Sequence, residues 1–119
     1  MSFRPERVAR EIQRILSQPI SEFALYNGGG LVTLTDVKVS PDLTVAKLYI
    51  SVYDNTLGGE RVVALLNERT QEFRSSVAQL RLRVIPELRF YLDTVFDRME
   101  RIEQLLKRQT PPSSANSGE

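Results

Sequence analysis

Pro86 constrains the fold of this chain more than any other residue, because it separates two segments with different apolar patterns. Proline fixes its own φ and keeps the residue before it out of the helical region, so the amphipathic segment that precedes it must end as a helix before Pro86. From Leu88 to Leu92, apolar residues alternate with Arg89 and Tyr91, which predicts a short half-buried strand. The residues that crowd this junction are arginines: Arg81, Arg83 and Arg89.

The size and composition of the chain indicate one globular domain. Its 119 residues are enough for a single hydrophobic core, and hydrophobic and charged residues make up 41% and 26% of the chain. No apolar run approaches the roughly 18 residues that a membrane-spanning helix needs. Residues 1–7 lack the apolar segment of a secretion signal. We therefore expect a cytoplasmic protein with no membrane partner.

The chain contains neither cysteine nor histidine. Their absence excludes disulfides, thiolate nucleophiles, imidazole acid–base catalysis and nearly every zinc site, so we expect no cofactor and no metal. The formal net charge is only +1, so any attraction to nucleic acid must depend on where the charges lie. Thirteen of the 16 basic residues are arginines, whose planar guanidinium groups can bind two phosphate oxygens at once.

The first quarter of the sequence predicts a helix and then a loop. Pro5 suits a first helical turn and apolar residues recur at helical spacing, so we expect a helix that runs to about Gln18 and stops before Pro19. Most of its basic residues have acidic neighbours three or four positions away, which favours a solvated face. Residues 19–30 end in three glycines, but a helix precedes them and a strand follows. Because this order is the reverse of a phosphate-binding loop, we expect a flexible loop without a nucleotide site.

Two strands are predicted next. Residues 31–40 are rich in β-branched side chains, and residues 44–53 alternate between apolar residues and a second face that carries Lys47 and Tyr49. The short connection between them contains turn residues with a proline, so the strands should form an antiparallel hairpin. Tyr49 on the second face is suited either to stack on a nucleobase or to support a neighbouring strand.

The segment from Glu60 towards the proline carries an apolar stripe in steps of three and four residues, which predicts either two helices or one kinked helix. Arg74 and Arg81 lie on one flank of this stripe, and neither has an acidic residue three or four positions away. Residues 69–89 contain five arginines and two glutamates, a local excess of three positive charges. This is the clearest charge asymmetry in the sequence.

The end of the chain predicts a helix and a tail. Thr94 and Asp97 suit a helix N-terminus, and an amphipathic pattern continues from there, so we expect a helix over residues 94–108. Residues 110–119 are rich in proline and serine and cannot bury enough apolar surface to become ordered. We therefore divide the chain into one domain, residues 1–109, and a disordered tail.

The predicted order is helix, strand, strand, helix, helix, strand, helix, which describes an α+β domain with helices on one face of a three-stranded sheet. This order is that of the bacterial, type II KH domain and differs from the βαββαβ order of RNA-recognition motifs. Short segments recur in a fixed order and spacing: Arg7–Ala9, Ile12–Arg14, Val32–Thr33, Thr35–Ser40, Asp42–Leu43, Ala46–Tyr49, Arg74–Ser75, Arg81–Arg83, Pro86–Leu88 with Phe90, and Arg101–Glu103. Through these segments the chain resembles the ribosome-binding factor A family over roughly residues 3–107.

The resemblance implies a non-enzymatic factor that binds the immature 30S small ribosomal subunit and its 16S rRNA, and that assists late assembly and processing of the rRNA 5′ end. The family is also linked to growth in the cold. Its members carry an Ala-x-Gly kink at the junction between two helices, where this sequence has Arg69-Thr70-Gln71. The Gly-x-x-Gly loop with which ordinary KH domains clamp nucleotides is absent. We expect a monomer with no small-molecule substrate.

We expect the domain to bind rRNA mainly through phosphate contacts, which fix affinity and orientation without reading sequence. The predicted RNA-binding residues are a principal group and its supporting charges: Arg74, Arg81, Arg83 and Arg89, then Arg69, Arg10, Arg14 and Lys47. The alternative for these residues is that they solubilise the surface or pair with acids elsewhere in the fold. A second hypothesis is a protein-interaction module that acts through the helix at 94–108. Catalysis is disfavoured, because Asp36 and Asp42 are the candidate carboxylates and no base, nucleophile or metal cluster accompanies them.

Overall fold

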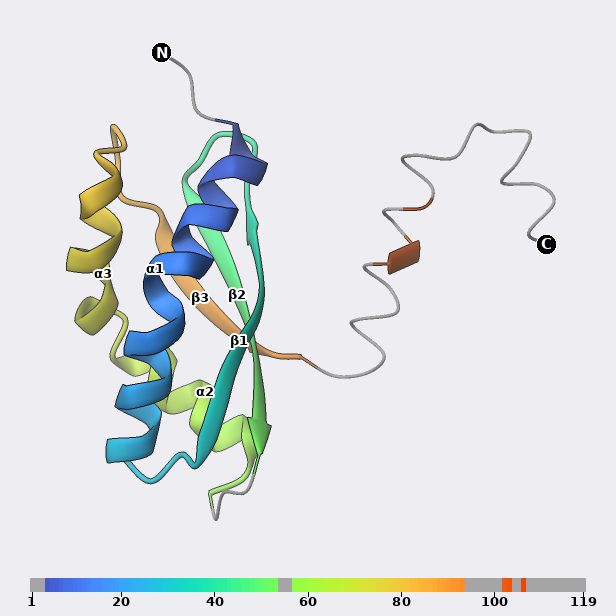
Figure 1. Cartoon of the computed structure of the whole chain (residues 1–119), viewed down its shortest axis with the longest axis vertical. Coiled ribbons are helices and arrows are strands. Elements are labelled where there is room, and N and C mark those ends of the chain that lie inside the picture. Colours follow the sequence, from blue (N-terminus) through green and yellow to red (C-terminus); the bar gives the residue numbers. More distant parts are fainter. Residues whose placement is uncertain (1–3, 54–56, 94–101, 104–105, 107–119) are drawn as a thin grey trace, which may run out of the picture.

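The computed structural model describes residues 4–53, 57–93, 102–103 and 106. Its elements follow the predicted order as far as the third strand (Figure 1). They are helix α1 (Pro5–Tyr26), strand β1 (Leu31–Val39), strand β2 (Val45–Tyr53), helix α2 (Gly59–Glu68), helix α3 (Gln71–Val77), the short 3-10 helix η1 (Ala78–Leu80) and strand β3 (Glu87–Leu92). The predicted helix at 94–108 and tail at 110–119 fall almost wholly outside the described residues. No helix in the described part of the chain is long and apolar enough to cross a membrane.

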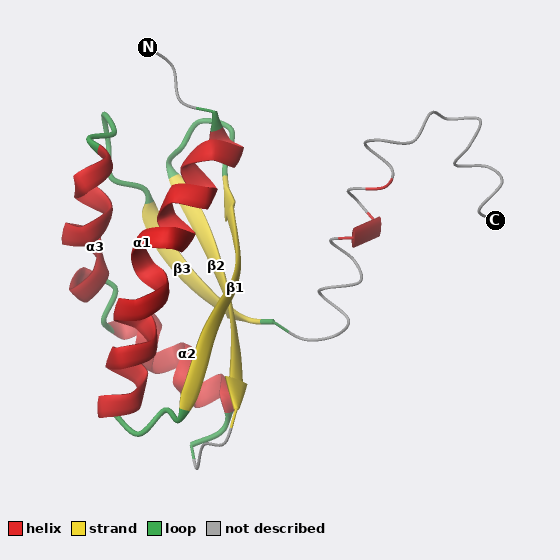
Figure 2. Ribbon diagram, in the orientation of Figure 1, coloured by secondary structure: helices red, strands yellow, loops and turns green. Residues whose placement is uncertain are grey.

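The three strands form one sheet in the order β1-β2-β3 (Figure 2). β1 and β2 pair antiparallel, which confirms the predicted hairpin, and β3 joins the other side of β2 in parallel. The register of β1 shifts between Leu34 and Asp36, so Thr35 is an extra residue in the strand. This bulge keeps Leu34 and Val37 on the same buried face although they are three residues apart.

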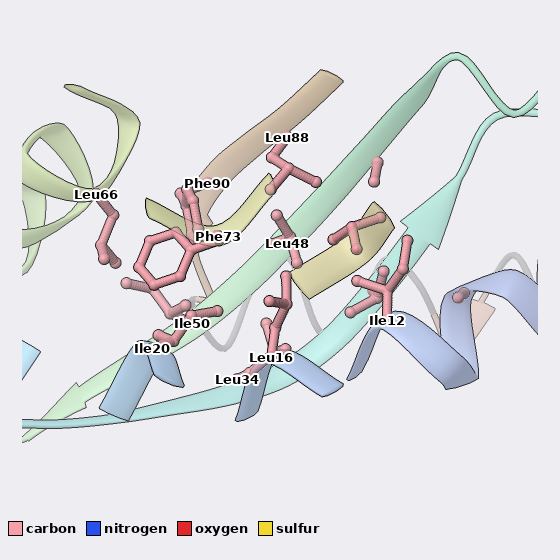
Figure 3. Packing of buried hydrophobic residues seen from close by; sticks show 14 of the residues in the cluster. Ile12, Leu16, Ile20, Leu34, Leu48, Ile50, Leu66, Phe73, Leu88 and Phe90 are labelled. Carbon is pink, nitrogen blue, oxygen red and sulfur yellow. The ribbon is translucent and has the colours of Figure 1, made fainter. Parts of the chain in front are cut away.

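The helices lie on one face of the sheet, because their buried side chains and those of the strands form a single core (Figure 3). α1 packs on β1 and beside α3, while α2 packs on β3 and β2. Alternate strand residues enter this core, among them Leu48 of β2 and Leu88 and Phe90 of β3, each at most 4% exposed. We call the opposite side of the sheet the open face, since no helix that the structure describes covers it.

α1 continues through Pro19 to Tyr26, so the predicted helix end before Pro19 and the predicted loop from that residue onwards are wrong. A proline inside a helix removes one hydrogen bond and crowds the preceding turn, a penalty of about 3 kcal/mol. Ile20 and Ala24 extend the buried stripe of α1 and are fully buried. Burying an isoleucine side chain alone stabilises the fold by about 1.5–3 kcal/mol. The tertiary core therefore outweighs the local preference, and the loop is confined to residues 27–30.

The junction between α2 and α3 is a break between two helices, which is one of the two forms that the apolar stripe predicted. Arg69 and Thr70 make this turn with φ angles of -121° and -60°. Since φ stays negative at both residues, the turn does not require glycine. This explains how the chain can form the junction with Arg69-Thr70-Gln71 in place of a glycine-containing kink.

Side chains from the helices occupy part of both edges of the sheet. On the β3 edge, the Asn67 side chain donates a hydrogen bond to the carbonyl of Phe90 at 3.1 Å and accepts one from its N–H at 2.8 Å. On the β1 edge, Ser21 and Gln13 of α1 donate hydrogen bonds to two strand carbonyls at 2.7 and 3.2 Å. Occupied edge groups hinder pairing with a further strand. The accessible surfaces that concern function are therefore the ends and the faces of the domain.

Candidate nucleic-acid interface

Arg74, Arg81 and Arg83, which we call the arginine cluster, come from α3 and from the turn between η1 and β3. Arg81 and Arg83 are exposed and Arg74 is half-buried. None of the three forms an ion pair with a residue that the structure describes. Arg10, exposed on α1, likewise has no ion pair within the described ranges. These residues therefore have no carboxylate at ion-pair distance within the described part of the fold.

Apolar contacts anchor the turn that carries Arg81 and Arg83. Leu82 and Ile85 pack against the core and Pro86 is fully buried, while the two arginines between these anchors are exposed. In Figure 1 the turn lies at the end of the molecule that also holds the start of α1 and the connection between β1 and β2. A fixed backbone thus presents two guanidinium groups to solvent at one end of the domain.

Arg81 closes η1 in a left-handed backbone conformation, with φ 57° and ψ 40°. Its N–H donates a hydrogen bond to the carbonyl of Ala78 at 3.0 Å, which completes the last turn. For an L-residue other than glycine this conformation costs about 1–2 kcal/mol. The backbone therefore turns towards Pro86 at Arg81, a positively charged residue in a strained backbone conformation.

Arg89 belongs to a different surface from the arginine cluster. It lies between Leu88 and Phe90, which enter the core, so it is on the open face of the sheet. Its Nε lies 3.0 Å from Oε2 of Glu87, and this hydrogen bond lowers the pKa of Glu87 and raises that of Arg89. The charge of Arg74 further lowers the pKa of Glu87. Arg74 is therefore near enough to Glu87, the first residue of β3, for their charges to interact.

Arg69 and Arg14 are engaged within the fold. The Arg69 guanidinium lies 5.2 Å from the centroid of the Phe23 ring, and its Nη2 lies 3.2 Å from a carboxylate oxygen of Glu72. Arg14 Nη2 lies 2.7 Å from Oε1 of Glu11, and this hydrogen bond lowers the pKa of the glutamate. Exposed pairs of this kind contribute little to stability, so either arginine can exchange its carboxylate for a phosphate.

The open face brings together residues that sequence analysis named only in part. Lys47 of β2 lies in register with Arg89 of β3 on one side and with Lys38 of β1 on the other, and we call these three residues the basic row. Two positions further along β2 and β3, Tyr49 and Tyr91 lie opposite each other with ring centroids 5.7 Å apart. Lys38 and Tyr91 were not predicted as site residues, although the alternation of residues 88–92 indicated that Tyr91 faces away from the core. The predicted RNA-binding residues therefore lie in four places, which are the arginine cluster, the open face, α1 and the α2–α3 junction.

The candidate catalytic carboxylates serve the local backbone and its turn. Oδ1 of Asp42 accepts hydrogen bonds from the hydroxyls of Ser40 and Thr44, each at 2.7 Å, and the bond from Ser40 has the largest effect in lowering the pKa of Asp42. Oδ1 of Asp36 accepts a hydrogen bond from the N–H of Val37 at 2.9 Å. Among the residues that the structure describes, no group of three or more carboxylates is placed to hold a metal ion.

Comparison with known proteins identifies the family. The family model described as Ribosome-binding factor A matches residues 4–106. The chain belongs to the ribosome-binding factor A family. The protein of that name from Chloroherpeton thalassium is 38% identical over 117 residues, which cover 96% of this chain and 93% of the relative. The one from Chlorobaculum parvum is 41% identical over 110 residues, with coverage of 90% and 91%. These relatives confirm the family resemblance.

Solved structures of ribosome-binding factor A proteins share the fold. The crystal structure of the Thermus thermophilus protein superposes with a TM-score of 0.63 at 22% identity, and covers 76% of this chain and 97% of that one. The solution structure of a Thermotoga maritima protein, a putative ribosome binding factor A, gives a TM-score of 0.60 at 30% identity and covers 76% and 87%. The predicted α+β, KH-like architecture is thereby confirmed.

Proposed function

We propose that this member of the ribosome-binding factor A family binds the immature 30S small ribosomal subunit through its 16S rRNA, and assists late assembly and 5′-end processing without catalysing a reaction of its own. The family supports a ribosomal partner. The observation that carries the RNA contact is the arginine cluster, with Arg81 and Arg83 exposed on an anchored turn and no ion pair to the described part of the fold.

Phosphate binding suits the chemistry of this cluster. A guanidinium group is always charged and presents paired donors that match two phosphate oxygens. Contacts of this kind fix the position and orientation of a protein on RNA but carry no sequence information. The shape of the folded rRNA, rather than base identity, would then select the site at which the arginine cluster docks.

Co-sedimentation with ribosomal particles tests this proposal. The protein should pellet with free small subunits in preference to large subunits and complete ribosomes. Replacing Arg74, Arg81 and Arg83 together by alanine should weaken this binding. The slope of log affinity against log salt concentration should fall by about 0.9 for each lost phosphate contact.

Arg61 supplies the matched control. It is also an exposed arginine without an ion pair to a described residue, but it belongs to α2, which lies towards the other end of the domain (Figure 1). Arg83→Ala should reduce the salt slope, whereas Arg61→Ala should leave it unchanged although both remove one positive charge. Equal effects of the two substitutions would show that binding depends on the net charge of the protein and not on the position of the arginine. Uniform binding to all ribosomal particles would contradict the small-subunit proposal.

A further inference from the structure

The open face of the sheet is a candidate ligand-binding surface. Strand residues alternate between the core and this face, and no helix in the described part of the chain packs on it. Tyr91, the penultimate residue of the edge strand β3, lies opposite Tyr49 in the middle of β2 and is 37% exposed. Among the described residues, this face combines aromatic rings and cations on adjacent strands.

The tyrosines form a continuous aromatic surface. Tyr49 and Tyr91 are directly opposite each other on parallel strands, their centroids are 5.7 Å apart, and their planes are inclined by only 30°. The two rings are therefore close neighbours on the open face. Aromatic side chains in this arrangement can stack on nucleobases, and each stacked base contributes about 1–3 kcal/mol whatever its identity.

The basic row borders these rings. Lys38, Lys47 and Arg89 lie in register on three adjacent strands, so they span roughly 10 Å across the sheet. The Nζ of Lys47 lies 6.0 Å from the centroid of the Tyr91 ring, which places a cation beside the stacking surface.

The acidic groups near the basic row already accept hydrogen bonds from the protein. The carboxylate of Glu87 accepts from Arg89. Oδ1 of Asp36 accepts from the N–H of Val37. A phosphate would therefore have to displace Glu87 from Arg89, which costs little because the pair is exposed.

We propose that the open face binds a single-stranded segment of RNA, with bases stacked on Tyr49 and Tyr91 and phosphates held by the basic row. The inference rests on the proposed function for the class of partner, and adds a second contact surface to the arginine cluster. A single strand fits better than a duplex, because bases must be unstacked from their neighbours before they can lie on aromatic side chains. The arginine cluster would hold folded rRNA by its phosphates while the open face holds an unpaired segment.

Fluorescence anisotropy with a labelled oligouridine of about 12 nucleotides tests the open face directly, since this probe has no stable secondary structure. Tyr91→Leu should weaken its binding about 5- to 100-fold, because the ring face is lost. Tyr91→Phe should bind almost as tightly as the original protein, because stacking does not need the hydroxyl. Lys47→Gln should reduce the salt slope by about 0.7, the value for one phosphate contact to a single strand.

Tyr26 provides the matched control, since it is 87% exposed at the end of α1 and lies outside the open face. Tyr26→Leu should leave oligouridine affinity unchanged. Equal affinities of the original protein and Tyr91→Leu, or no binding of oligouridine by the original protein, would overturn the inference. If Tyr91→Leu instead lowers the melting temperature and leaves affinity unchanged, the Tyr91 ring serves packing and not RNA binding, and the inference is also wrong.

The two proposals fail in different ways. If the protein co-sediments with free small subunits but oligouridine binding does not depend on Tyr91, the open-face inference fails and the proposed function stands. If oligouridine binding depends on Tyr91 but no preference for small subunits is seen, the open face binds RNA and the proposed ribosomal role fails.

Discussion

At Arg81 the backbone and the proposed function favour different residues. A φ of 57° lies in the left-handed region, where glycine is unstrained and an L side chain is not. Helices commonly end at a glycine in this conformation, yet here the residue is an exposed arginine. Backbone strain of this kind is found at functional positions, where the remainder of the fold holds it in place. We attribute the choice of arginine to the phosphate contact proposed for it.

This account predicts opposite effects of Arg81→Gly on stability and on binding. Relief of the strain, less the extra freedom that glycine gives the unfolded chain, should raise the free energy of unfolding by about 0.5–1 kcal/mol. Loss of the guanidinium should weaken binding to free small subunits and reduce the salt slope by about 0.9. Urea denaturation and co-sedimentation over a range of salt concentrations measure the two effects.

Arg81→Asn separates strain from charge, because asparagine tolerates the left-handed conformation better than other residues with a side chain. Both substitutions should reduce the salt slope of binding by the same amount. Arg81→Gly should raise the free energy of unfolding more than Arg81→Asn does. A glycine variant that unfolds more easily than the original protein would show that Arg81 is not strained. An unchanged salt slope in both variants would remove Arg81 from the phosphate-binding surface.

At the scale of elements, core packing keeps α1 helical through Pro19 although a proline inside a helix is destabilising. Pro19→Ala should raise the free energy of unfolding by about 1–2 kcal/mol, since the restored hydrogen bond is offset in part by a less restricted unfolded chain. Pro5→Ala is the control, because Pro5 lies in the first turn, where its missing N–H has no partner to lose. Chemical denaturation measures both. Equal effects at the two positions, or a loss of stability at Pro19, would show that the helix is adapted to the proline ring.

The elements that could be predicted from sequence are those decided by short-range patterns. Strict alternation from residue 44 to 53 and the turn after Ser40 led to the correct hairpin, and Pro86 correctly ended the helical segment before β3. The C-terminal half of α1 was missed because Pro19 is a strong local signal, whereas the burial of Ile20 depends on β-strands that are distant in sequence. Core packing cannot be weighed against a proline until the core is known.

The candidate site was only partly predictable for a related reason. Charge counting located the arginine-rich segment from residue 69 to 89, but it could not assign those arginines to faces of the fold. The alternation of Leu88 and Phe90 was enough to place Arg89 away from the core. The alignment of Arg89 with Lys38 could not be predicted, because it depends on the parallel pairing of β3 with β2 and on the bulge in β1.

At the scale of the whole molecule, Phe73 connects the layers on which the two proposed surfaces are built. Its ring meets that of Phe23 in α1 edge to face at 5.6 Å and that of Phe90 in β3 at 5.8 Å. Phe73 is 2% exposed and immediately precedes Arg74 in α3. The position of Arg74 relative to the sheet therefore depends in part on this buried aromatic side chain.

Phe73→Leu tests whether this packing matters for binding as well as for stability. Loss of two aromatic contacts of about 0.5–1.5 kcal/mol each should lower the free energy of unfolding by about 1–3 kcal/mol, and Tyr26→Leu, at an exposed position, should leave it unchanged. Thermal denaturation followed by circular dichroism measures this difference.

At low temperature, where the Phe73→Leu variant is folded, its affinity for oligouridine should match that of the original protein, because both open-face tyrosines remain. Its affinity for free small subunits should fall, because Arg74 is no longer held at a fixed position relative to β3. If both affinities are unchanged, binding does not depend on the position that Phe73 gives to Arg74, and Arg74 no longer belongs with Arg81 and Arg83 in the proposed phosphate-binding surface.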